Sequence, residues 1–569
     1  MPTDRPFTLE SRSIDALPLV NHLLARLRLG DLLTQHVPAG DRRQRLVPAK
    51  ALGVLVRNLL LARVPLYSQP AWAARAVPRL LGLLPAEVVR LTDDQVGRAL
   101  DRLFDADRAT LLTQVVVRAV STFGVDLAQL HNDSTTVTFT GEYRQARGRT
   151  LRGRRALAIG HGHNKDHRPD LKQLLFVLTV SADGAVPIHY QACDGNTEDS
   201  TTHVDTWEVL RALAGRPDFL YVADSKLCTE ETMRHIDARQ GRFITVLPRT
   251  RREEAFFRDW LQTHTPAWQE VARRGNPRRQ AGPPDVWKAV ESPTPSQEGY
   301  RIVWVWSSLK AEQDEQARAA RIEKAGLALE DFRTRLRSPR CRYKSRGAVA
   351  DAAAQLVDQA GAPRWVGLEV LEQAEPVFRQ ERRGRPGRAT RYLRRQRLRF
   401  DVAWNATVAT IEYDARCDGM FPLITNERDL ALAEILTAYK YQPRLEKRHE
   451  QLKSVYAVAP VLLKNEGRIE ALLFLYFVVL LVQALLERDV RRAMTERGIT
   501  SLPLYPEDRE CLAPSADGIF QVFAGLQHHQ LRRRDTLIQT FPPELTPLQR
   551  QILDLLGISP QEFTDAKLG

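Results

Sequence analysis

Cysteine is scarce in this chain, and we find no signal for secretion. The five cysteines among 569 residues stand far apart and form no CxxC pair. This spacing argues against a disulfide framework or a zinc knuckle and fits a reducing cytoplasm. The polar N-terminus, MPTDRPFTLESRS, lacks the apolar segment of a secretory signal. The one long apolar run, Ala471–Leu486, is too short to span a bilayer, so we expect a buried helix and no membrane partner.

Acidic residues are outnumbered by basic ones. The chain has 83 Lys and Arg against 69 Asp and Glu, which gives a net charge of +14 and a pI near 9.7. This excess indicates a polyanionic partner, with nucleic acid ahead of anionic membrane. The hydrophobic share of 43% and the charged share of 27% are ordinary for a soluble globular protein. A chain of this length is too long for one domain.

Hydrophobic periodicity changes along the first half of the chain. Residues 1–120 show helical spacing, whereas from Gly124 short apolar runs alternate with helical segments. The predicted strands are Leu127–Asp133, Thr136–Phe139, Leu174–Gly184, Val186–Ala192, Phe219–Asp224 and Phe243–Leu247, with helices at Trp207–Leu213 and Glu230–Arg239. Several strands, then helix, strand, helix and strand make a mixed α/β sheet.

Two aspartates follow apolar strands of this predicted sheet. Asp133 lies in HNDSTT and Asp224 in VADSKL, and strand ends are where α/β sheets place their chemistry. For either residue alone, an ordinary turn or cap aspartate is the favoured interpretation. With Glu446 from a later helix, they would form a three-carboxylate site suited to hard cations such as Mg²⁺. Two such ions would stabilise the attacking and leaving oxygens of phosphoryl transfer.

The stretch Thr425–Ser454 is predicted to be helical from Asn426 on, and one side of this helix carries a stripe of mixed side chains. At about 100° per residue, Tyr439, Gln442, Glu446 and Lys453 fall on one narrow side. A solvated amphipathic helix is the alternative interpretation. Glu450 is a rival third carboxylate, but only Glu446 has Lys453 seven residues on. Within the same stretch, Pro443 is expected to kink the helix and displace Tyr439, and His449 is expected on the helix surface.

The middle of the chain departs from the sheet pattern. We predict strands at Tyr300–Leu309, Trp365–Leu371, Leu398–Ala403 and Thr407–Tyr413, a long helix over Ala311–Leu336, and one more strand at Gly419–Thr425. Ten arginines lie between Arg379 and Arg399. They suit either a solvated hairpin tip or contact with phosphates, and the charge of the chain favours phosphate contact. The arginines expected on DNA are Arg385, Arg388, Arg391, Arg394 and Arg395.

Six motifs follow one another along the chain in an order that is typical of one family of enzymes. They are NDSTTVTFTGEY around Asp133, KDHRPDLKQ, DGNTED, DFLYVADSK around Asp224, DGMFPLITN and LEKRHEQLKS. The chain resembles bacterial insertion-sequence transposases of the DDE class over residues 10–490. In the group that it resembles, an RNase H-like domain carries a β-rich insertion before the catalytic Glu.

The resemblance implies a division of the chain into five parts. Residues 1–120 would be a helical N-terminal domain for DNA-end binding or dimerisation. Residues 121–250 and 418–497 would be the two parts of the catalytic domain, and 251–417 the inserted β-rich basic domain. The mostly helical remainder, 498–569, would offer a dimer contact.

The resemblance also implies the chemistry. The catalytic triad and metal ligands map to Asp133, Asp224 and Glu446, with two Mg²⁺ ions that Mn²⁺ can replace. The YREK helix signature maps to Tyr439, Gln442, Glu446 and Lys453, where Gln442 replaces the Arg. Cleavage at the element's end would leave a 3′-OH that attacks target DNA, in much of this group after forming a hairpin. The partners would be double-stranded DNA, as terminal inverted repeats and target, and a second copy of the chain on the bacterial nucleoid, in the cytoplasm.

Two other functions compete with transposition. A repurposed transposase could bind DNA without cutting it, although all three carboxylates and Lys453 are present. A nuclease acting on generic nucleic acid would not need the helical N-terminal domain or the arginine-rich insertion. Inverted repeats flanking the open reading frame would favour the mobile element.

Overall fold

The fold is described from a computed structural model, which covers residues 7–39, 45–275, 282–338, 340–455, 463–533 and 536–564, with only the backbone of residues 454, 455 and 508. Part of the polar N-terminus, residues 1–6, lies outside these ranges. The chain divides into two compact units. The first contains residues 1–245 and 437–569, and the second contains residues 246–436. The five-part division stays a prediction.

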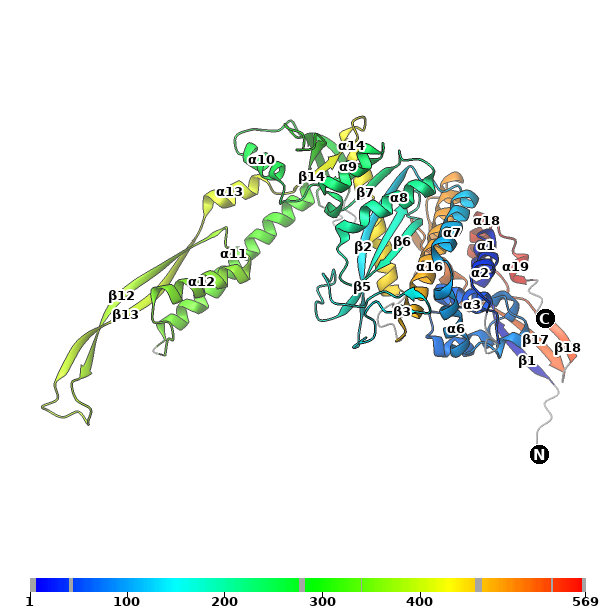
Figure 1. Ribbon diagram of the computed structural model, residues 1–569, viewed down its shortest axis with the longest axis horizontal. Helices are drawn as coiled ribbons and strands as arrows, with labels where there is room; N and C mark the ends of the chain where they lie inside the picture. Colours follow the sequence, from blue (N-terminus) through cyan, green and yellow to red (C-terminus); the bar gives the residue numbers. More distant parts are fainter. Residues whose placement is uncertain are drawn as a thin grey trace. The chain divides into compact units, whose positions relative to one another are not determined.

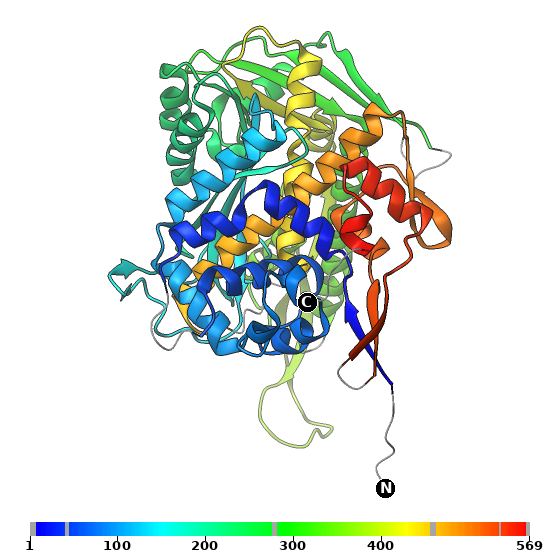
Figure 2. The same cartoon turned by 90° about the vertical axis from the view of Figure 1, so that its right-hand side faces the viewer.

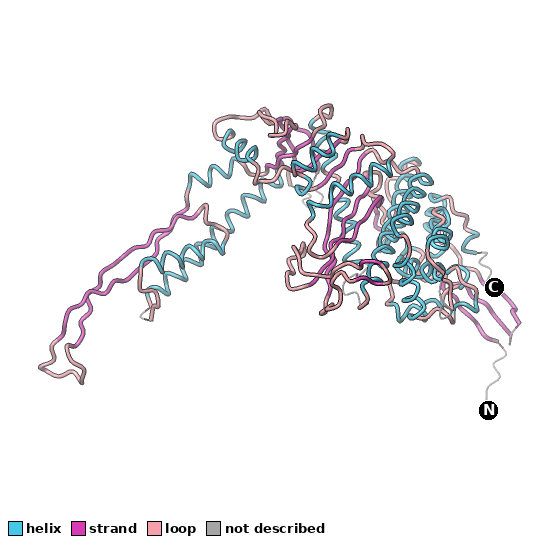
Figure 3. The backbone as a smooth tube through the Cα atoms, in the orientation of Figure 1, coloured by secondary structure: helices cyan, strands magenta, loops and turns pink. Residues whose placement is uncertain are grey.

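A mixed sheet is the centre of the first unit. Its strands are β2 (Gln129–Phe139), β5 (Lys172–Ser181), β6 (Pro187–Cys193), β7 (Leu220–Ala223) and β8 (Arg242–Val246), in the order β6-β5-β2-β7-β8. Strand β5 runs antiparallel to β2 and β6, whereas β7 runs parallel to β2 and β8. Figure 3 shows these strands with helices beside them. The mixed α/β sheet predicted from the sequence is confirmed.

Strand β2 corrects one prediction. We expected two strands, Leu127–Asp133 and Thr136–Phe139, with Asp133 ending the first. The structure has one continuous strand, because Ser134 and Thr135 keep their pairing with Val177 and Phe176 of β5. Both polar side chains are buried, at 6% and 4% exposure, so their polarity does not mark a turn. Asp133 therefore lies within β2.

Two sets of helices contact the sheet of the first unit. Helices α8 (His203–Ala214) and α9 (Glu230–Ala238) pack against each other, and α8 contacts β6. Helix α15 (Gln442–Glu450) contacts β2 and β5, while α16 (Glu466–Glu496) also contacts β6. Side chains alternate along a strand, so neighbouring residues of β2 point to different faces. Asn132 contacts His203 of α8, whereas His131 contacts Gln442 of α15.

The long helix α16 forms a shared core with the N-terminal helices. Those helices are α1 (Leu17–Arg26), α2 (Leu29–His36), α3 (Pro48–Leu61), α4 (Gln69–Arg75), α5 (Pro85–Val88), α6 (Asp93–Asp105) and α7 (Arg108–Phe123). Helix α16 contacts α1, α3 and α6, and Figure 2 shows it among the blue N-terminal helices. By length and composition α16 could cross a membrane, but its apolar window is entirely buried in the protein. The prediction of a buried helix over Ala471–Leu486 is confirmed.

The C-terminal region contains more strands than we predicted. Its elements are β15 (Leu502–Tyr505), β16 (Arg509–Cys511), α17 (Ala516–Val522), β17 (Gln527–Arg533), β18 (Thr536–Phe541), α18 (Pro547–Leu556) and α19 (Gln561–Thr564). The prediction of a mostly helical region is wrong. Strand β17 pairs with β18 and with β1 (Thr8–Ser13), a partner more than five hundred residues away that local periodicity cannot reveal.

The second unit combines a small sheet with long helices and a hairpin. Strands β14 (Met420–Thr425), β11 (Arg301–Ser307), β10 (Asp285–Glu291) and β9 (Gln269–Arg274) pair with one another in this order, each pair antiparallel. The helices are α10 (Arg252–Trp260), α11 (Ser308–Arg337), α12 (Arg346–Ala360) and α13 (Val408–Arg416). In Figure 1, α11 and α12 lie beside the hairpin of β12 (Val366–Gln380) and β13 (Tyr392–Ala406). The long helix predicted over Ala311–Leu336 is confirmed as α11, whereas α10, α12 and α13 are helices that we did not predict.

The predicted strand Thr407–Tyr413 is wrong, because most of this segment lies in helix α13. Its β-branched residues favour a strand, but tertiary contacts decide the outcome. The hydroxyl of Thr410 donates to the carbonyl of Arg364, and the hydroxyl of Tyr413 donates to Asp259 at 2.7 Å. The indole of Trp365 donates to Asp414 at 2.6 Å. These bonds fix the segment as a helix.

Candidate active site

The register between β2 and β7 brings two carboxylates side by side. Asn132 pairs with Ala223, so Asp133 and Asp224 are the next residues along adjacent parallel strands. Residues aligned in this way point to the same face, about 4.8 Å apart from strand to strand. Asp224 also accepts a hydrogen bond from the backbone N–H of Lys226 at 3.0 Å, which orients its carboxylate at the start of the next turn.

The pKa shifts of Glu446 and Tyr439 show that both residues interact with charges of this aspartate pair. Burial raises the pKa of Asp133, and burial together with the charge of Asp133 raises that of Asp224. The pKa of the exposed Glu446 is raised by partial burial and by Asp133. Burial and the charges of all three carboxylates raise the pKa of Tyr439 to about 12. Tyr439 therefore lies within electrostatic range of Asp133, Asp224 and Glu446, and Glu446 within that of Asp133.

The described residues do not include a group of three His, Cys, Asp or Glu side chains already placed to hold a metal ion. The ammonium group of a lysine, Lys165, lies beside Asp133 instead. The ammonium of Lys165 is 2.9 Å from Asp199 Oδ2 and 3.5 Å from Asp133 Oδ1. It also donates to the carbonyl oxygen and the hydroxyl of Ser134, each at 2.7 Å. The sequence motif KDHRPDLKQ contains this lysine, but its position could not be predicted from spacing.

His449 is a second residue whose place we did not predict. We expected it on the helix surface, but it is buried, and its Nδ1 lies 3.7 Å from Asp133 Oδ2. Its Nε2 is buried without a hydrogen-bond partner among the described residues. Burial, with Lys165 and Lys453 nearby, lowers the pKa of His449 to about 3, so the ring is neutral. The nitrogen that faces Asp133 is thus Nδ1, at a distance longer than a hydrogen bond, and the partnerless Nε2 is the other ring nitrogen.

A buried polar network supports Asp133 from the other face of β2. Asn132 accepts a hydrogen bond from the hydroxyl of Thr179 at 2.8 Å and contacts His203. The ring of His203 lies 3.1 Å from the hydroxyl of Tyr221 on β7. Such a satisfied network fixes β2 and β7 in register, and with them the two aspartates.

The helix predicted over Thr425–Ser454 is interrupted. Helix α14 (Leu432–Tyr439) ends before α15 begins at Gln442, and Pro443 occupies the first turn of α15, where its missing N–H costs nothing. The predicted kink is thus a break between two helices. A π-helical segment, Gln451–Val455, follows α15 and carries Lys453.

Gln442 lies inside the first unit. It is 7% exposed, and its Oε1 is 3.0 Å from His131 Nδ1. Its amide donates to the carbonyl of Asn132 at 3.3 Å. Gln442 thus anchors α15 on β2, and a DNA contact would require it to leave this position. Lys453 is 29% exposed and pairs with Asp166 at 2.6 Å.

The predicted DNA-binding arginines belong to the hairpin of the second unit. Arg385, Arg388 and Arg391 lie in the loop between its strands, Arg394 and Arg395 lie on β13, and all five are exposed. Arg394 pairs with Phe378 and Arg395 with Val377, which places the two arginines on opposite faces of the hairpin. In the part of the chain that the structure describes, Arg399 alone among the ten arginines has a carboxylate partner, Glu375.

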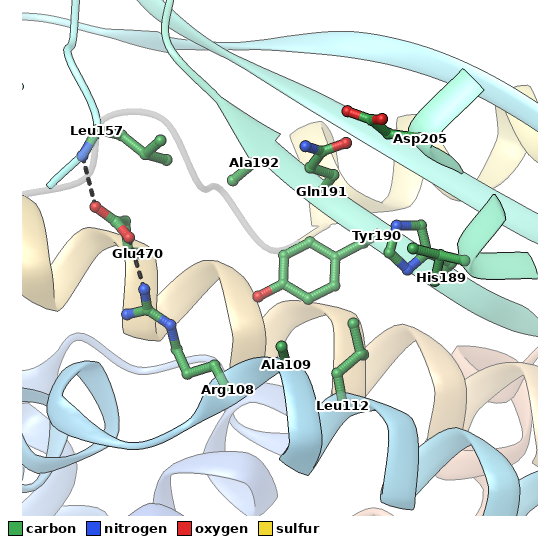
Figure 4. A pocket seen from close by; sticks show the side chains of 11 residues that line it. Arg108, Ala109, Leu112, Leu157, His189, Tyr190, Gln191, Ala192, Asp205 and Glu470 are labelled. Atoms are coloured by element: carbon green, nitrogen blue, oxygen red, sulfur yellow. Dashed lines mark hydrogen bonds and ion pairs between the residues drawn. The ribbon is translucent and has the colours of Figure 1, made fainter. Parts of the chain in front are cut away.

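A separate cavity of about 290 Å³ lies beside the edge strand β6. Figure 4 shows Glu470 of α16 between the backbone N–H of Leu157 and the guanidinium of Arg108, with Tyr190 across from them. Burial raises the pKa of Glu470. None of the predicted site residues lines this cavity, so it is distinct from the carboxylate edge.

The similarities of this chain to known proteins are partial or distant. Residues 9–117 match a family described as a domain of unknown function (DUF4277), which covers less than half of the chain. No curated protein matches. Among solved structures, the piggyBac transposase synaptic complex with hairpin DNA is 10% identical, with a TM-score of 0.39 over 91% of this chain and 81% of that one. The Mos1 transposase paired-end complex is 10% identical, with a TM-score of 0.13 over 35% and 59%. Such TM-scores do not establish a common fold.

Proposed function

We propose that the chain is a DDE transposase that cuts DNA at the ends of an insertion sequence and joins them to target DNA. The observation that carries this proposal is the register of β2 and β7, in which Asp133 and Asp224 each follow the paired residues Asn132 and Ala223, with Glu446 in electrostatic range of Asp133. The sequence motifs around all three residues support it. So does the strand order of an antiparallel trio followed by two parallel strands, which we take as RNase H-like.

The chemistry of the donor set fits a hard divalent cation. Three carboxylates offer oxygen ligands, and the pKa values of Asp133, Asp224 and Glu446 are raised first by burial and, for Asp224 and Glu446, also by the charge of Asp133. Bound there, Mg²⁺ or Mn²⁺ would stabilise the attacking and leaving oxygens of phosphoryl transfer.

The remaining residues position the DNA. Lys453 would bind a backbone phosphate near the scissile bond, because its ammonium reaches the protein surface on the segment that follows α15. Tyr439, beside the three carboxylates, would pack against a displaced base. The exposed hairpin arginines would contact the backbone of duplex DNA independently of its sequence. This function assigns the chain to the cytoplasm, at the nucleoid, and to a dimer on DNA.

The test is strand cleavage of the DNA that flanks the open reading frame, with Mg²⁺ or Mn²⁺. We expect Asp133→Asn and Asp224→Asn to abolish cleavage and to leave affinity for the same fragment nearly unchanged, because each keeps its side-chain shape. Lys453→Ala should weaken binding and leave partial activity. A wild-type protein that binds these ends but never cuts with either metal would support the repurposed DNA-binding protein instead.

A further inference from the structure

The loop over residues 160–173 presents two adjacent residues of opposite charge to the site. Asn164 is buried and accepts hydrogen bonds from the backbone N–H groups of Asp166, at 2.8 Å, and Arg168, at 3.2 Å. Its amide donates to Gln173, which donates in turn to the carbonyl of Gly195 at 2.9 Å. This buried network holds the backbone on either side of Lys165 and Asp166.

Lys165 points into the carboxylate edge. Its ammonium has four oxygen atoms within 3.5 Å, from Asp133, Asp199 and both oxygens of Ser134. Among the described residues it is the only lysine or arginine paired with Asp133. An ammonium ringed by oxygens occupies the kind of position that a metal cation would take.

Asp166 points the other way, to the segment after α15. Its carboxylate lies 2.6 Å from the ammonium of Lys453, which is the proposed phosphate contact. A carboxylate on that ammonium occupies the place of a phosphate oxygen. Neighbouring residues of one loop therefore contact the two groups that would receive metal and DNA.

We propose that Lys165 and Asp166 form a latch that mimics both ligands of the site and is displaced when they bind. The ammonium of Lys165 replaces the cation at Asp133, and the carboxylate of Asp166 replaces the phosphate at Lys453. The inference rests on the proposed function and adds a regulatory step to it. Without metal and DNA, the latch keeps the charged groups of the site compensated and the site closed.

Two observations make this displacement feasible. The contact with Asp133 is the longest of the four that Lys165 makes, and the contacts with Asp199 and Ser134 would remain after Asp133 is released. On another side of Asp133, the ring of His449 is more than nine-tenths buried, and its Nδ1 lies 3.7 Å from Asp133 Oδ2, just beyond hydrogen-bond distance. The surroundings of Asp133 therefore still have a hydrogen bond to offer when the ammonium moves.

Metal affinity tests the first half of the latch. Titration of the whole, DNA-free protein with Mn²⁺, followed by electron paramagnetic resonance, measures the bound ion directly. We expect Lys165→Met to bind Mn²⁺ roughly tenfold more tightly than wild type, because no internal cation competes for Asp133. Lys172→Met is the matched control: Lys172 begins strand β5 and donates to the carbonyl of Glu142, away from the carboxylates. Its Mn²⁺ affinity should equal that of wild type.

The same titration separates failure of the latch from failure of the proposed function. Asp133→Asn should lose the ion. If Asp133→Asn binds Mn²⁺ as wild type does, the metal site itself is wrong. If Asp133→Asn loses the ion while Lys165→Met binds it no more tightly than wild type, the metal site stands and the latch is overturned.

DNA affinity tests the second half and does not depend on how well Lys165→Met folds. Asp166→Asn frees Lys453, so we expect a short duplex of arbitrary sequence to bind roughly two- to fivefold more tightly in fluorescence anisotropy. Asp170→Asn is the control, because it removes a carboxylate from the same loop that pairs only with Arg168 among the described residues. If Asp166→Asn and Asp170→Asn raise the affinity for DNA equally, the change in net charge explains the effect. The proposed contact of Asp166 with Lys453 as part of the latch is then overturned.

Discussion

At the scale of single residues, Gln442 shows how a substitution in a recognised signature changes a role. The signature would have a surface Arg at this position, whereas Gln442 is buried and bonded to His131 and Asn132. A neutral amide suits this place, since burial lowers the pKa of His131 to about 4 and the ring carries no charge. Sequence comparison could identify the departure but not its consequence, which depends on the contact between α15 and β2.

Gln442→Leu should destabilise the protein. The change leaves the Nδ1 of His131 without its partner in a buried place and removes the amide that donates to the carbonyl of Asn132, at a cost of about 1–3 kcal/mol. Urea unfolding followed by circular dichroism measures the loss. The control is Gln145→Leu, on the exposed surface of the same unit. Equal stabilities of the two variants would show that the buried amide has no anchoring role.

His189 should make the protein sensitive to acid. Burial lowers its pKa from 6.5 to about 4. Between these values the unfolded chain binds a proton that the folded chain does not, so stability falls as pH drops from 6.5 to 4 and the loss levels off below 4. His189→Leu should remove up to about 3 kcal/mol of that loss. Denaturant unfolding of both proteins at about pH 7 and about pH 4 measures it; parallel losses would contradict the assignment.

At the scale of elements, the hairpin β12–β13 has two different faces near its tip. Cross-strand pairing places Phe378, Tyr392 and Arg394 on one face, and Arg379, Arg395 and Arg397 on the other. Phe378 and Tyr392 are 63% and 51% exposed. The sequence shows the abundance of arginine, but only the register shows that the charge is concentrated on one face.

The double variant Arg394→Gln/Arg395→Gln should weaken binding to any duplex DNA. If both arginines contact phosphates, the slope of log affinity against log salt should fall in magnitude by about 2. The control is Arg273→Gln/Arg337→Gln, since these exposed arginines of the same unit already pair with Glu270 and Asp401. If the salt dependence of the double variant has the same slope as that of wild type, the hairpin arginines do not contact phosphates and only face solvent.

Elements with strong local patterns were predicted well, and those decided by distant contacts were not. The strands β5, β6, β7 and β11 and the buried helix α16 follow from their apolar spacing. Strand β2 was divided in two because buried polar residues resemble a turn. The pairing of β1 with β17 depends on segments from opposite ends of the sequence. In the site, the carboxylates came from motifs, but the positions of Lys165 and His449 depend on packing that periodicity does not encode.

At the scale of the whole molecule, the account depends on three carboxylates far apart in sequence acting together. Asp133 and Asp224 come from neighbouring strands and Glu446 from a helix that follows the second unit in the chain. Lys165 compensates part of their charge in the form described. The first unit therefore contains every residue to which the proposed chemistry is assigned, and the second unit contributes charge for DNA.

The assignment of the third carboxylate is tested most directly by comparing Glu446→Gln with Glu450→Gln. Both residues are exposed on α15, one helical turn apart, so the two variants differ mainly in which carboxylate is lost. The measurement is strand cleavage, with Mn²⁺, of the DNA that flanks the open reading frame. We predict that Glu446→Gln abolishes cleavage while Glu450→Gln cuts nearly as well as wild type. Full cleavage by Glu446→Gln, or its loss in Glu450→Gln alone, would contradict the proposed active site.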